Sequence, residues 1–493
     1  MLMVRHLPLV DFPNHLARFV VRDHLASGSV LSDFYAWHWA FIPTLGLDLA
    51  MLPLHGLLPV EAAGNLALTL ALILLCLGTV AVDRALNRTH WGLSVFTGIL
   101  LYNGAFRFGF ASYIIGTSLA LPLFALWVVR RGQPGLISER MAETLRGGPK
   151  ARLPILDRRY AVITDTLGFA LAGAALVLIH LYAFGLYAVC VAGYEASLLL
   201  EATRSRRGWH LPPLGRSVLV AVTLVLPLLP LRLSPTAAQA GVTRWSTLGW
   251  KIEALVSPIY FNQPRIELPL LGILIVTIAL GLLSGTVRLH QRMVLPMFAF
   301  AVLVLALPRM LFGSNYADYR LLSGAGFFFL ASLRLDRPVA WRGKGFVAVL
   351  TACLILRVGS VAWDWTRVQP ILEEYETALA PLPPGSRLLV MRGDVEPRSR
   401  RRSPPLEHVP VLAAARRESF TGYIFADLIT PLYLRPAYQS YIHATPDGVP
   451  PSELGRYDYL LAVQNPMIDV PKDITLVPIG HGQTYVLSRI ERH

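Results

Sequence analysis

Long apolar stretches alternate with short, arginine-rich polar segments from about residue 60 to residue 363. Ten of these stretches approach the roughly 20 residues that a helix needs to cross the hydrocarbon core of a bilayer. We split the long runs 93–129 and 160–200 into two helices each. The predicted spans lie near residues 62–82, 93–110, 111–129, 160–180, 181–200, 215–232, 266–284, 293–309, 321–333 and 344–363. The short ninth span is expected to begin earlier, which would draw Tyr319 and Arg320 toward the membrane.

The pattern changes after Trp363. Residues 366–380 read as a helix that a proline-rich segment ends, and four short strands are predicted over 386–391, 457–463, 474–478 and 484–490. The expected fold is therefore a polytopic α-helical membrane protein with about ten transmembrane helices and a small C-terminal α/β domain. The predicted units are a first loop with an amphipathic interfacial helix (1–61), a transmembrane helical domain (62–363) and the α/β domain (364–493).

The composition supports a membrane protein. Hydrophobic residues make up 54% of the chain and charged residues only 15%, whereas soluble domains carry about 25% charged residues. A water-soluble enzyme and a disordered chain are both disfavoured. The net charge of +14 would suggest nucleic acid for a soluble protein, but in a membrane protein it indicates cytoplasmic loops. The three cysteines lie in apolar runs and are expected to be small core residues.

Basic residues predict the orientation. One alternating set of loops, which includes 130–159, holds 20 Lys and Arg, and the opposite set holds 10. The richer set is expected in the cytoplasm. Residues 1–61, the loop 233–265 and everything after 363 then share the outer side. This requires either a translocated N-terminal tail or a helix upstream of residue 1, and we favour the second because residues 1–10 are too short to cross.

The most informative motif is Asp11-Phe-Pro-Asn-His-Leu-Ala-Arg18. Pro13 suits the first turn of a helix, where its missing N–H costs nothing. From that start His15, Arg18 and Arg22 fall on one helix face, and Asp11 lies at the favourable end of the helix dipole. An acid, an imidazole and two guanidiniums thus meet at the membrane surface. The alternative is a capped amphipathic helix with snorkelling arginines.

This motif resembles the first-loop motif of the GT-C superfamily of integral membrane glycosyltransferases. The run from Asn315 to Gly326, which carries Arg320, resembles the start of a late helix in bacterial members, and the C-terminal outer domain also fits. The resemblance implies transfer of a sugar from a polyprenyl-phosphate carrier at the outer face, with the first-loop acid as general base or acceptor-positioning group. The chain departs from the family in lacking the first helix and the adjacent acidic pair. The second acid is therefore open among Asp23, Asp33 and Asp48.

The chemistry also follows from the residues. A lipid-phosphate sugar needs cations for its phosphate and a carboxylate that takes a proton from the acceptor hydroxyl. We assign catalysis to Asp11 and His15. Substrate binding is assigned to residues that are polar or aromatic at predicted membrane edges: Arg18, Arg107, His180, Trp245, Lys251 and Arg320. Each of the latter group has an alternative as an interface anchor or a satisfied interface histidine.

No cofactor is assigned; the lipid-phosphate-linked sugar is a substrate. A divalent metal stays open, although the available ligands His24, His38, His55, Asp33 and Asp48 show no tight spacing. Nucleotide-binding and dinucleotide-binding loops and a serine nucleophile elbow are missing in the expected context, so a transport ATPase is disfavoured. The expected partners are membrane lipid, the polyprenyl-phosphate sugar and a glycan or lipid acceptor, without nucleic acid. The expected location is the bacterial inner membrane. A flippase or transporter of lipid-linked sugars and a non-catalytic partner in envelope polysaccharide assembly remain alternatives.

Overall fold

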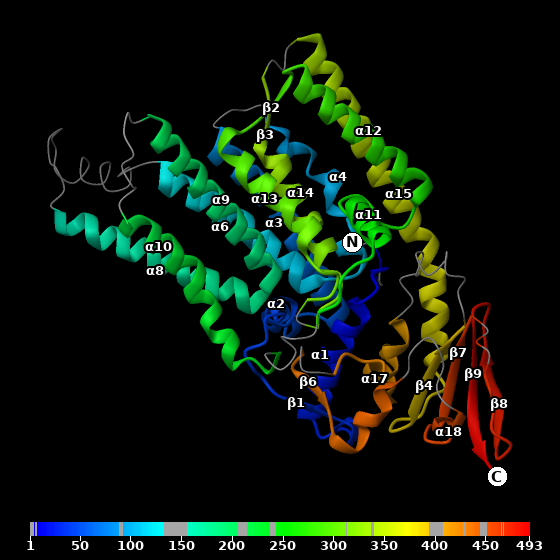
Figure 1. The fold of residues 1–493 in the computed structure, drawn as a ribbon. Coiled ribbons are helices and arrows are strands. Elements are labelled where there is room, and N and C mark those ends of the chain that lie inside the picture. Colours follow the sequence, from blue (N-terminus) through cyan, green and yellow to red (C-terminus); the bar gives the residue numbers. More distant parts are fainter. Residues whose placement is uncertain are drawn as a thin grey trace.

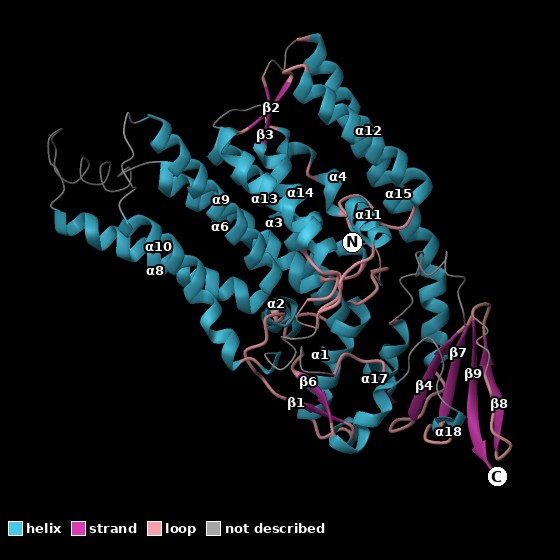
Figure 2. Cartoon of the chain, viewed as in Figure 1, coloured by secondary structure: helices cyan, strands magenta, loops and turns pink. Residues whose placement is uncertain are grey.

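The computed structural model describes residues 4, 7–87, 92–132, 155–205, 214–236, 243–311, 313–336, 340–393, 408–426, 430–443, 451–464, 466 and 468–493. Most of the basic loop 130–159 and the arginine-rich run 398–402, which the sequence predicts to be a solvated loop, lie outside these residues. The described part is mostly helical, with a small sheet near the C-terminus, as the sequence predicts (Figures 1 and 2).

Apolar helices form a bundle in the first three quarters of the chain (Figure 1). Among the described residues five helices are long and apolar enough to cross a membrane: α3 (Val60–Asn87), α6 (Ala111–Gly132), α9 (Leu181–Ser205), α12 (Pro264–Leu283) and α15 (Trp341–Leu379). The other bundle helices are α8 (Ile155–Ile179), α10 (Leu214–Val225), α13 (Val294–Ala306) and α14 (Ala317–Ser332). As expected, α14 begins before residue 321 and contains Arg320.

The bundle has a packed centre and apolar flanks. Helices α3, α6, α9 and α14 share one core of buried side chains. Figure 1 shows α8 and α10 on one flank and α12 and α15 on the other. The flanking α12 exposes large apolar side chains such as Ile273, Ile275 and Leu280, which are 48%, 59% and 60% exposed. Such a surface suits lipid contact, because water would penalise it.

The predicted span 93–110 differs from a regular helix. It consists of a 3₁₀ turn (Leu93–Phe96) and the short helices α4 (Gly98–Leu101) and α5 (Gly104–Arg107). The Asn103 side chain accepts the Phe106 N–H at 3.0 Å and so caps α5 as a separate helix. Gly109, just after α5, has φ +75°. The segment still traverses the bundle. Gly92 pairs with Arg334 at one end, and the carbonyls of Arg107 and Phe108 bind residues 10 and 11 at the other.

The C-terminal part is a five-stranded mixed sheet (magenta in Figure 2) with the order β5-β4-β7-β9-β8. Its strands are β4 (Arg387–Arg392), β5 (Phe420–Thr421), β7 (Tyr459–Val463), β8 (Ile474–His481) and β9 (Tyr485–Arg492). Four of them match the predicted strands. The short helices α17 (Leu412–Arg417) and α18 (Pro451–Leu454) accompany the sheet. The expected domain boundary at residue 364 falls inside the continuous helix α15.

The first loop joins the bundle to the C-terminal part. Helix α1 (Phe12–Ala26) contributes Phe12 and Phe19 to the bundle core and Ala17 and Val21 to a core shared with the sheet region. Strand β1 (Tyr35–Trp37) pairs antiparallel with β6 (Leu432–Leu434). Helix α2 (Gly46–His55) completes this region. Helix α1 is thus packed between two bodies, which is a stronger constraint than an interfacial helix on lipid would have.

Two further small elements matter for the site. Strands β2 (Val287–Leu289) and β3 (Leu333–Leu335) form a two-stranded antiparallel sheet at the end of the bundle far from α1. Helix α11 (Leu248–Val256) lies beside α14, in the segment before α12. We call the two ends of the bundle the α1 end and the β2–β3 end.

Candidate functional site

Asp11 lies where three parts of the chain meet at the α1 end. It directly precedes α1, and its backbone N–H donates to the Phe108 carbonyl at 2.9 Å. Gly109 permits this approach, since a Cβ there would lie 2.9 Å from the Phe12 nitrogen. Asp11 is the N-cap residue of α1, but its side chain makes no capping hydrogen bond. The carboxylate is therefore turned to other groups.

One imidazole adjoins this carboxylate, and a second, that of His15, belongs to the first turn of α1. Nε2 of His408, which comes from the C-terminal part, lies 3.4 Å from Oδ1 of Asp11. Burial, aided by the charge of Arg392, lowers the pKa of His408 to about 4. Burial also lowers the pKa of His15 well below its usual value, and the charges of Arg18 and His408 act in the same direction. Burial thus favours the neutral form of both rings, in which each imidazole has one donor and one acceptor nitrogen.

Arg320 is the cation on the bundle side of the site. It is only 7% exposed, and its Nη1 donates to Ser314 Oγ at 2.8 Å and to the Asn315 carbonyl at 2.6 Å. Asp11 is among the groups whose charge acts on it. Its guanidinium carbon stacks 3.8 Å from the centre of the Phe110 ring. The predicted acid and the predicted phosphate-binding arginine are thus brought together.

A buried hydroxyl fixes the backbone of Arg320. The Tyr113 hydroxyl donates to the Arg320 carbonyl, and the absence of a side chain at Gly324 makes room for it, because a Cβ there would lie 2.3 Å from that oxygen. His180, between α8 and α9, packs edge-on against the same tyrosine with ring centres 5.4 Å apart. Its Nδ1 accepts the Tyr182 N–H at 3.2 Å. His180 therefore supports the ring that holds α14 in place.

Aromatic rings line the space between Asp11 and Arg320. Phe108 stacks on Tyr316 with ring centres 4.4 Å apart, and Phe110 lies 6.2 Å from the same ring. Tyr316 has φ +62°, a left-handed conformation that is strained for a side chain of this size. Backbone strain of this kind clusters at functional sites. We call the rings of Phe108, Phe110 and Tyr316 the aromatic floor, because they place an apolar surface beside the charged groups at this end of the bundle.

Arg107 and Arg18 are already engaged. Arg107 Nε donates to Asn262 Oδ1 at 2.8 Å, and its guanidinium carbon lies 5.4 Å from the centres of both the Phe108 and Tyr260 rings. Arg18 Nη2 lies 2.9 and 3.0 Å from the two carboxylate oxygens of Asp48, and both side chains are buried. The charge of Arg18 is thus neutralised within the fold.

The other candidate acids differ in their surroundings. Asp48 is held by Arg18, whereas Asp23 contacts Arg22 and His55. Asp33 is exposed. Among the described residues no three His, Cys, Asp or Glu side chains are arranged to hold a metal ion. Of the four acids, Asp11 is the one whose charge is among those that act on Arg320.

Two predicted binding residues lie apart from Asp11. Lys251 on α11 donates to the Val304 carbonyl at 2.8 Å and to the Leu307 carbonyl, and it lies 3.3 Å from Asp318 Oδ2. It therefore ties α11 to the end of α13 and to α14. Trp245 is 71% exposed, which suits an interface anchor.

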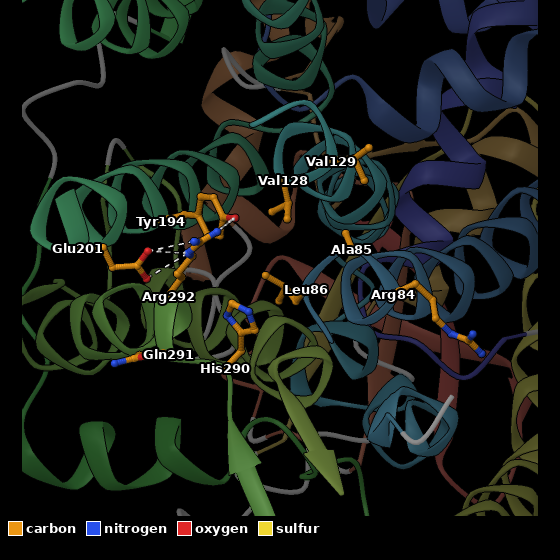
Figure 3. Close-up of a pocket in the computed structure, with 10 residues that line it drawn as sticks. All are labelled: Arg84, Ala85, Leu86, Val128, Val129, Tyr194, Glu201, His290, Gln291 and Arg292. Carbon is orange, nitrogen blue, oxygen red and sulfur yellow. Dashed lines mark hydrogen bonds and ion pairs between the residues drawn. The ribbon is translucent and has the colours of Figure 1, made fainter. Parts of the chain in front are cut away.

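A cavity of about 640 Å³ lies at the β2–β3 end of the bundle, where His290 and Arg292 line it (Figure 3). Figure 3 shows Arg292 directed at Glu201 and Tyr194, and Arg292 Nε lies 3.1 Å from both Glu201 carboxylate oxygens. The charge of Arg292 is thus balanced by Glu201. We nevertheless place the candidate site at the α1 end, despite its smaller open volume, because Asp11 acts there on the buried Arg320, which has no carboxylate partner among the described residues.

Sequence reasoning missed His408 and the aromatic floor. His408 stands 397 positions from Asp11 in the chain, as their numbers show, and no local pattern connects them. Phe108 and Phe110 read as ordinary apolar positions of a predicted span, and Tyr316 is noted only as part of the run from Asn315 to Gly326. No known family model, curated protein or solved structure matches the chain. The arrangement itself therefore carries the functional argument.

Proposed function

We propose that the chain is a GT-C-type membrane glycosyltransferase. It moves a sugar from a polyprenyl-phosphate carrier to an envelope glycan, lipid or protein acceptor, at the outer face of a bacterial cytoplasmic membrane. The observation that supports this most is that Asp11, which His408 contacts, and the buried Arg320, on which the Asp11 charge acts, lie at the same end of an apolar helix bundle. A carboxylate and a guanidinium are the two groups that this transfer needs.

In the proposed mechanism Asp11 accepts the proton of the acceptor hydroxyl as that oxygen attacks the anomeric carbon of the sugar. The bond from the sugar to the carrier phosphate breaks, and the phosphate leaves with its electron pair. Arg320 balances the charge that develops on this phosphate. His408 positions the Asp11 carboxylate, and the aromatic rings keep water away from the leaving group.

Arg320 provides the test of this proposal. Arg320→Lys should lower sugar transfer about as strongly as Arg320→Ala, because one ammonium cannot reproduce the two-pronged donation of a guanidinium. The measurement is transfer of radiolabelled sugar from polyprenyl phosphate in proteoliposomes, normalised to protein that elutes as a single species. Full transfer by both variants would show that Arg320 is only a structural anchor.

Topology gives an independent prediction. About ten membrane crossings and the excess of basic residues place 130–159 in the cytoplasm and 364–493 outside. Reporter fusions after Arg152 and after Pro384 should therefore give opposite compartment signals. Alkaline phosphatase and fluorescent reporters measure this directly. Equal signals would mean an even number of crossings between these positions, and the site would then lie on the wrong side for an outer-face reaction.

The transporter alternative receives less support. Transporters place ionisable groups that bind substrate near the middle of the membrane. The clearest such residue is Arg357 on α15, but its Nη1 donates to Glu267 Oε1 at 2.6 Å, and both side chains are buried. Arg357 also donates to the Tyr102 carbonyl. A cation held in this way is a structural group, which favours the enzyme.

A further inference from the structure

Arg309 resembles Arg320 in having no acidic partner. By contrast, the buried arginines Arg18 and Arg357 form ion pairs with Asp48 and Glu267. Within the part of the chain that the structure describes, no carboxylate oxygen lies within 4 Å of either Arg309 or Arg320, and the Nε atom of each is buried without a hydrogen-bond partner. A buried or half-buried cation without a counter-charge is costly. Two such cations at one place indicate a site for an anion.

Aromatic stacking holds both guanidiniums against one group of rings, those of Trp250, Tyr316 and Phe110, which we call the platform. The guanidinium carbon of Arg309 lies 3.6 Å from the centre of the Trp250 ring and 4.9 Å from that of Tyr316. Arg320 stacks on Phe110, whose ring lies 6.2 Å from Tyr316. Stacking fixes the plane of a guanidinium and leaves its N–H edge for an oxyanion. The left-handed Tyr316 stands between the two cations.

The nearby acids are engaged elsewhere. Asp318 accepts from Ser246 Oγ at 3.0 Å and lies 3.3 Å from Lys251 Nζ. Glu253 interacts with the Tyr319 hydroxyl. The remaining charge near the platform is that of Asp11, which acts on Arg320 from beyond ion-pair distance. The platform is therefore positive on the side of Arg309.

The apolar surface beside the platform indicates that the anion is attached to a lipid. Trp250 belongs to α11, whose opposite face exposes apolar side chains: Leu248 (77%), Ile252 (57%) and Leu255 (53%). Helix α13, which Lys251 links to α11, also exposes large apolar side chains: Phe298 (66%), Val302 (47%) and Leu305 (73%). Lys251 joins the two helices through the carbonyls at the end of α13. An exposed apolar face next to an aromatic–basic rim is typical of a helix that lies in a lipid leaflet.

We propose that Arg309 and Arg320 together bind the phosphate of a membrane-embedded lipid, which reaches them from the side of the bundle along α11 and α13. The hydrocarbon tail stays on the exposed apolar surface, while Arg309 is the first cation that the phosphate meets and Arg320 the second, beside Asp11. This inference rests on the proposed function for the fate of the lipid, because Arg320 serves both.

Binding of polyprenyl monophosphate to the full chain in phosphatidylcholine nanodiscs tests the proposal. Native mass spectrometry gives the bound fraction, and quenching of tryptophan fluorescence by a brominated polyprenyl phosphate reports on Trp250. Arg309→Gln should weaken binding tenfold or more, the scale of a lost charge-assisted contact. Arg244→Gln is the matched control, since Arg244 is an exposed arginine in the same segment, bridged through its backbone to Met310. It should change binding less than twofold.

Two comparison ligands distinguish a lipid-linked phosphate from a free phosphate or a bare hydrocarbon chain. The corresponding polyprenol, without phosphate, and inorganic phosphate should each bind at least tenfold more weakly than polyprenyl monophosphate. Equal binding of the polyprenol would reduce the surface to an apolar groove, and equal binding of inorganic phosphate would show a site for a free anion; either result overturns the proposal. If Arg309→Gln does not fold, Arg309→Lys keeps the charge but loses the planar guanidinium that stacks on Trp250, and should still bind more weakly.

Asp11→Asn distinguishes this inference from the proposed function. It should retain binding of polyprenyl monophosphate and lose sugar transfer. Binding that depends on Arg309 in a chain without transferase activity would support the lipid-phosphate site and count against the enzyme. Sugar transfer with binding that is unchanged in Arg309→Gln would support the enzyme and overturn the site.

Discussion

Replacing Asp11 by asparagine should lower sugar transfer by on the order of 100-fold or more while the protein stays folded and inserted. The amide has nearly the shape of the carboxylate but cannot accept a proton. A structural cap would tolerate the change, because asparagine caps helices about as well as aspartate. The structure sharpens this contrast, since the Asp11 side chain makes no capping hydrogen bond to α1.

The experiment compares Asp11→Asn with Asp33→Asn in the same proteoliposome assay. Asp33 is an exposed acid of the same first loop, at the end of a 3₁₀ turn (Val30–Asp33), and it is a fair control for a general loss of negative charge. Transfer should survive in Asp33→Asn. Full transfer by Asp11→Asn would show that Asp11 is not the general base. Loss of transfer in Asp33→Asn alone would assign the general base to Asp33. Rates are normalised to monodisperse protein, so that poor expression does not count as lost chemistry.

The elements of the fold were largely readable from periodicity. Apolar length located the helices of the bundle, and β-rich runs bounded by prolines and glycines located β4, β7, β8 and β9. The stretch 93–110 was misread as one helix, because its apolar composition hides Asn103 and Gly109, whose capping and left-handed backbone break it. The continuation of α15 through residue 364 was also missed, since a shift in composition does not end a helix.

The site was only partly readable, for a physical reason. Asp11 and Arg320 were found because ionisable groups at membrane edges stand out against an apolar background. Their surroundings depend on long-range packing. Asn14 Oδ1 accepts the Phe425 N–H at 2.9 Å and helps to hold the C-terminal part against α1, which brings His408 to Asp11. Nor does the sequence show that Arg18 is neutralised by Asp48, which is 30 positions away.

A second large effect is expected inside the bundle, at Glu267. Its carboxylate accepts the N–H groups of Phe261, Asn262 and Gln263 at 3.0–3.1 Å and the guanidinium of Arg357 at 2.6 Å. Glu267 is 2% exposed and Arg357 is fully buried. Glu267→Ala would leave a buried cation and three backbone donors without their acceptor. We expect a loss of about 3–5 kcal/mol in the free energy of unfolding.

Unfolding in mixed micelles, followed by circular dichroism, measures this loss. Asp336→Asn is the control, because its pair with Arg288 spans 3.1 Å with 58% of the arginine and 27% of the aspartate side chain exposed. Such a pair contributes at most about 1 kcal/mol. The double variant Glu267→Leu with Arg357→Leu should regain part of the stability lost in Glu267→Ala, since it removes the unpaired charge.

The result also bears on the choice between enzyme and transporter. If Glu267→Ala costs no more than the exposed control, Arg357 is stable without its partner, and an unpaired cation within the bundle would again qualify as a substrate-binding group of a transporter. A large loss that the double variant partly restores shows that Arg357 is destabilising inside the bundle when it has no carboxylate partner. Arg357 then has no freedom to change partners during a transport cycle. The α1 end, where Asp11 and Arg320 lie, then remains the candidate site for the proposed sugar transfer.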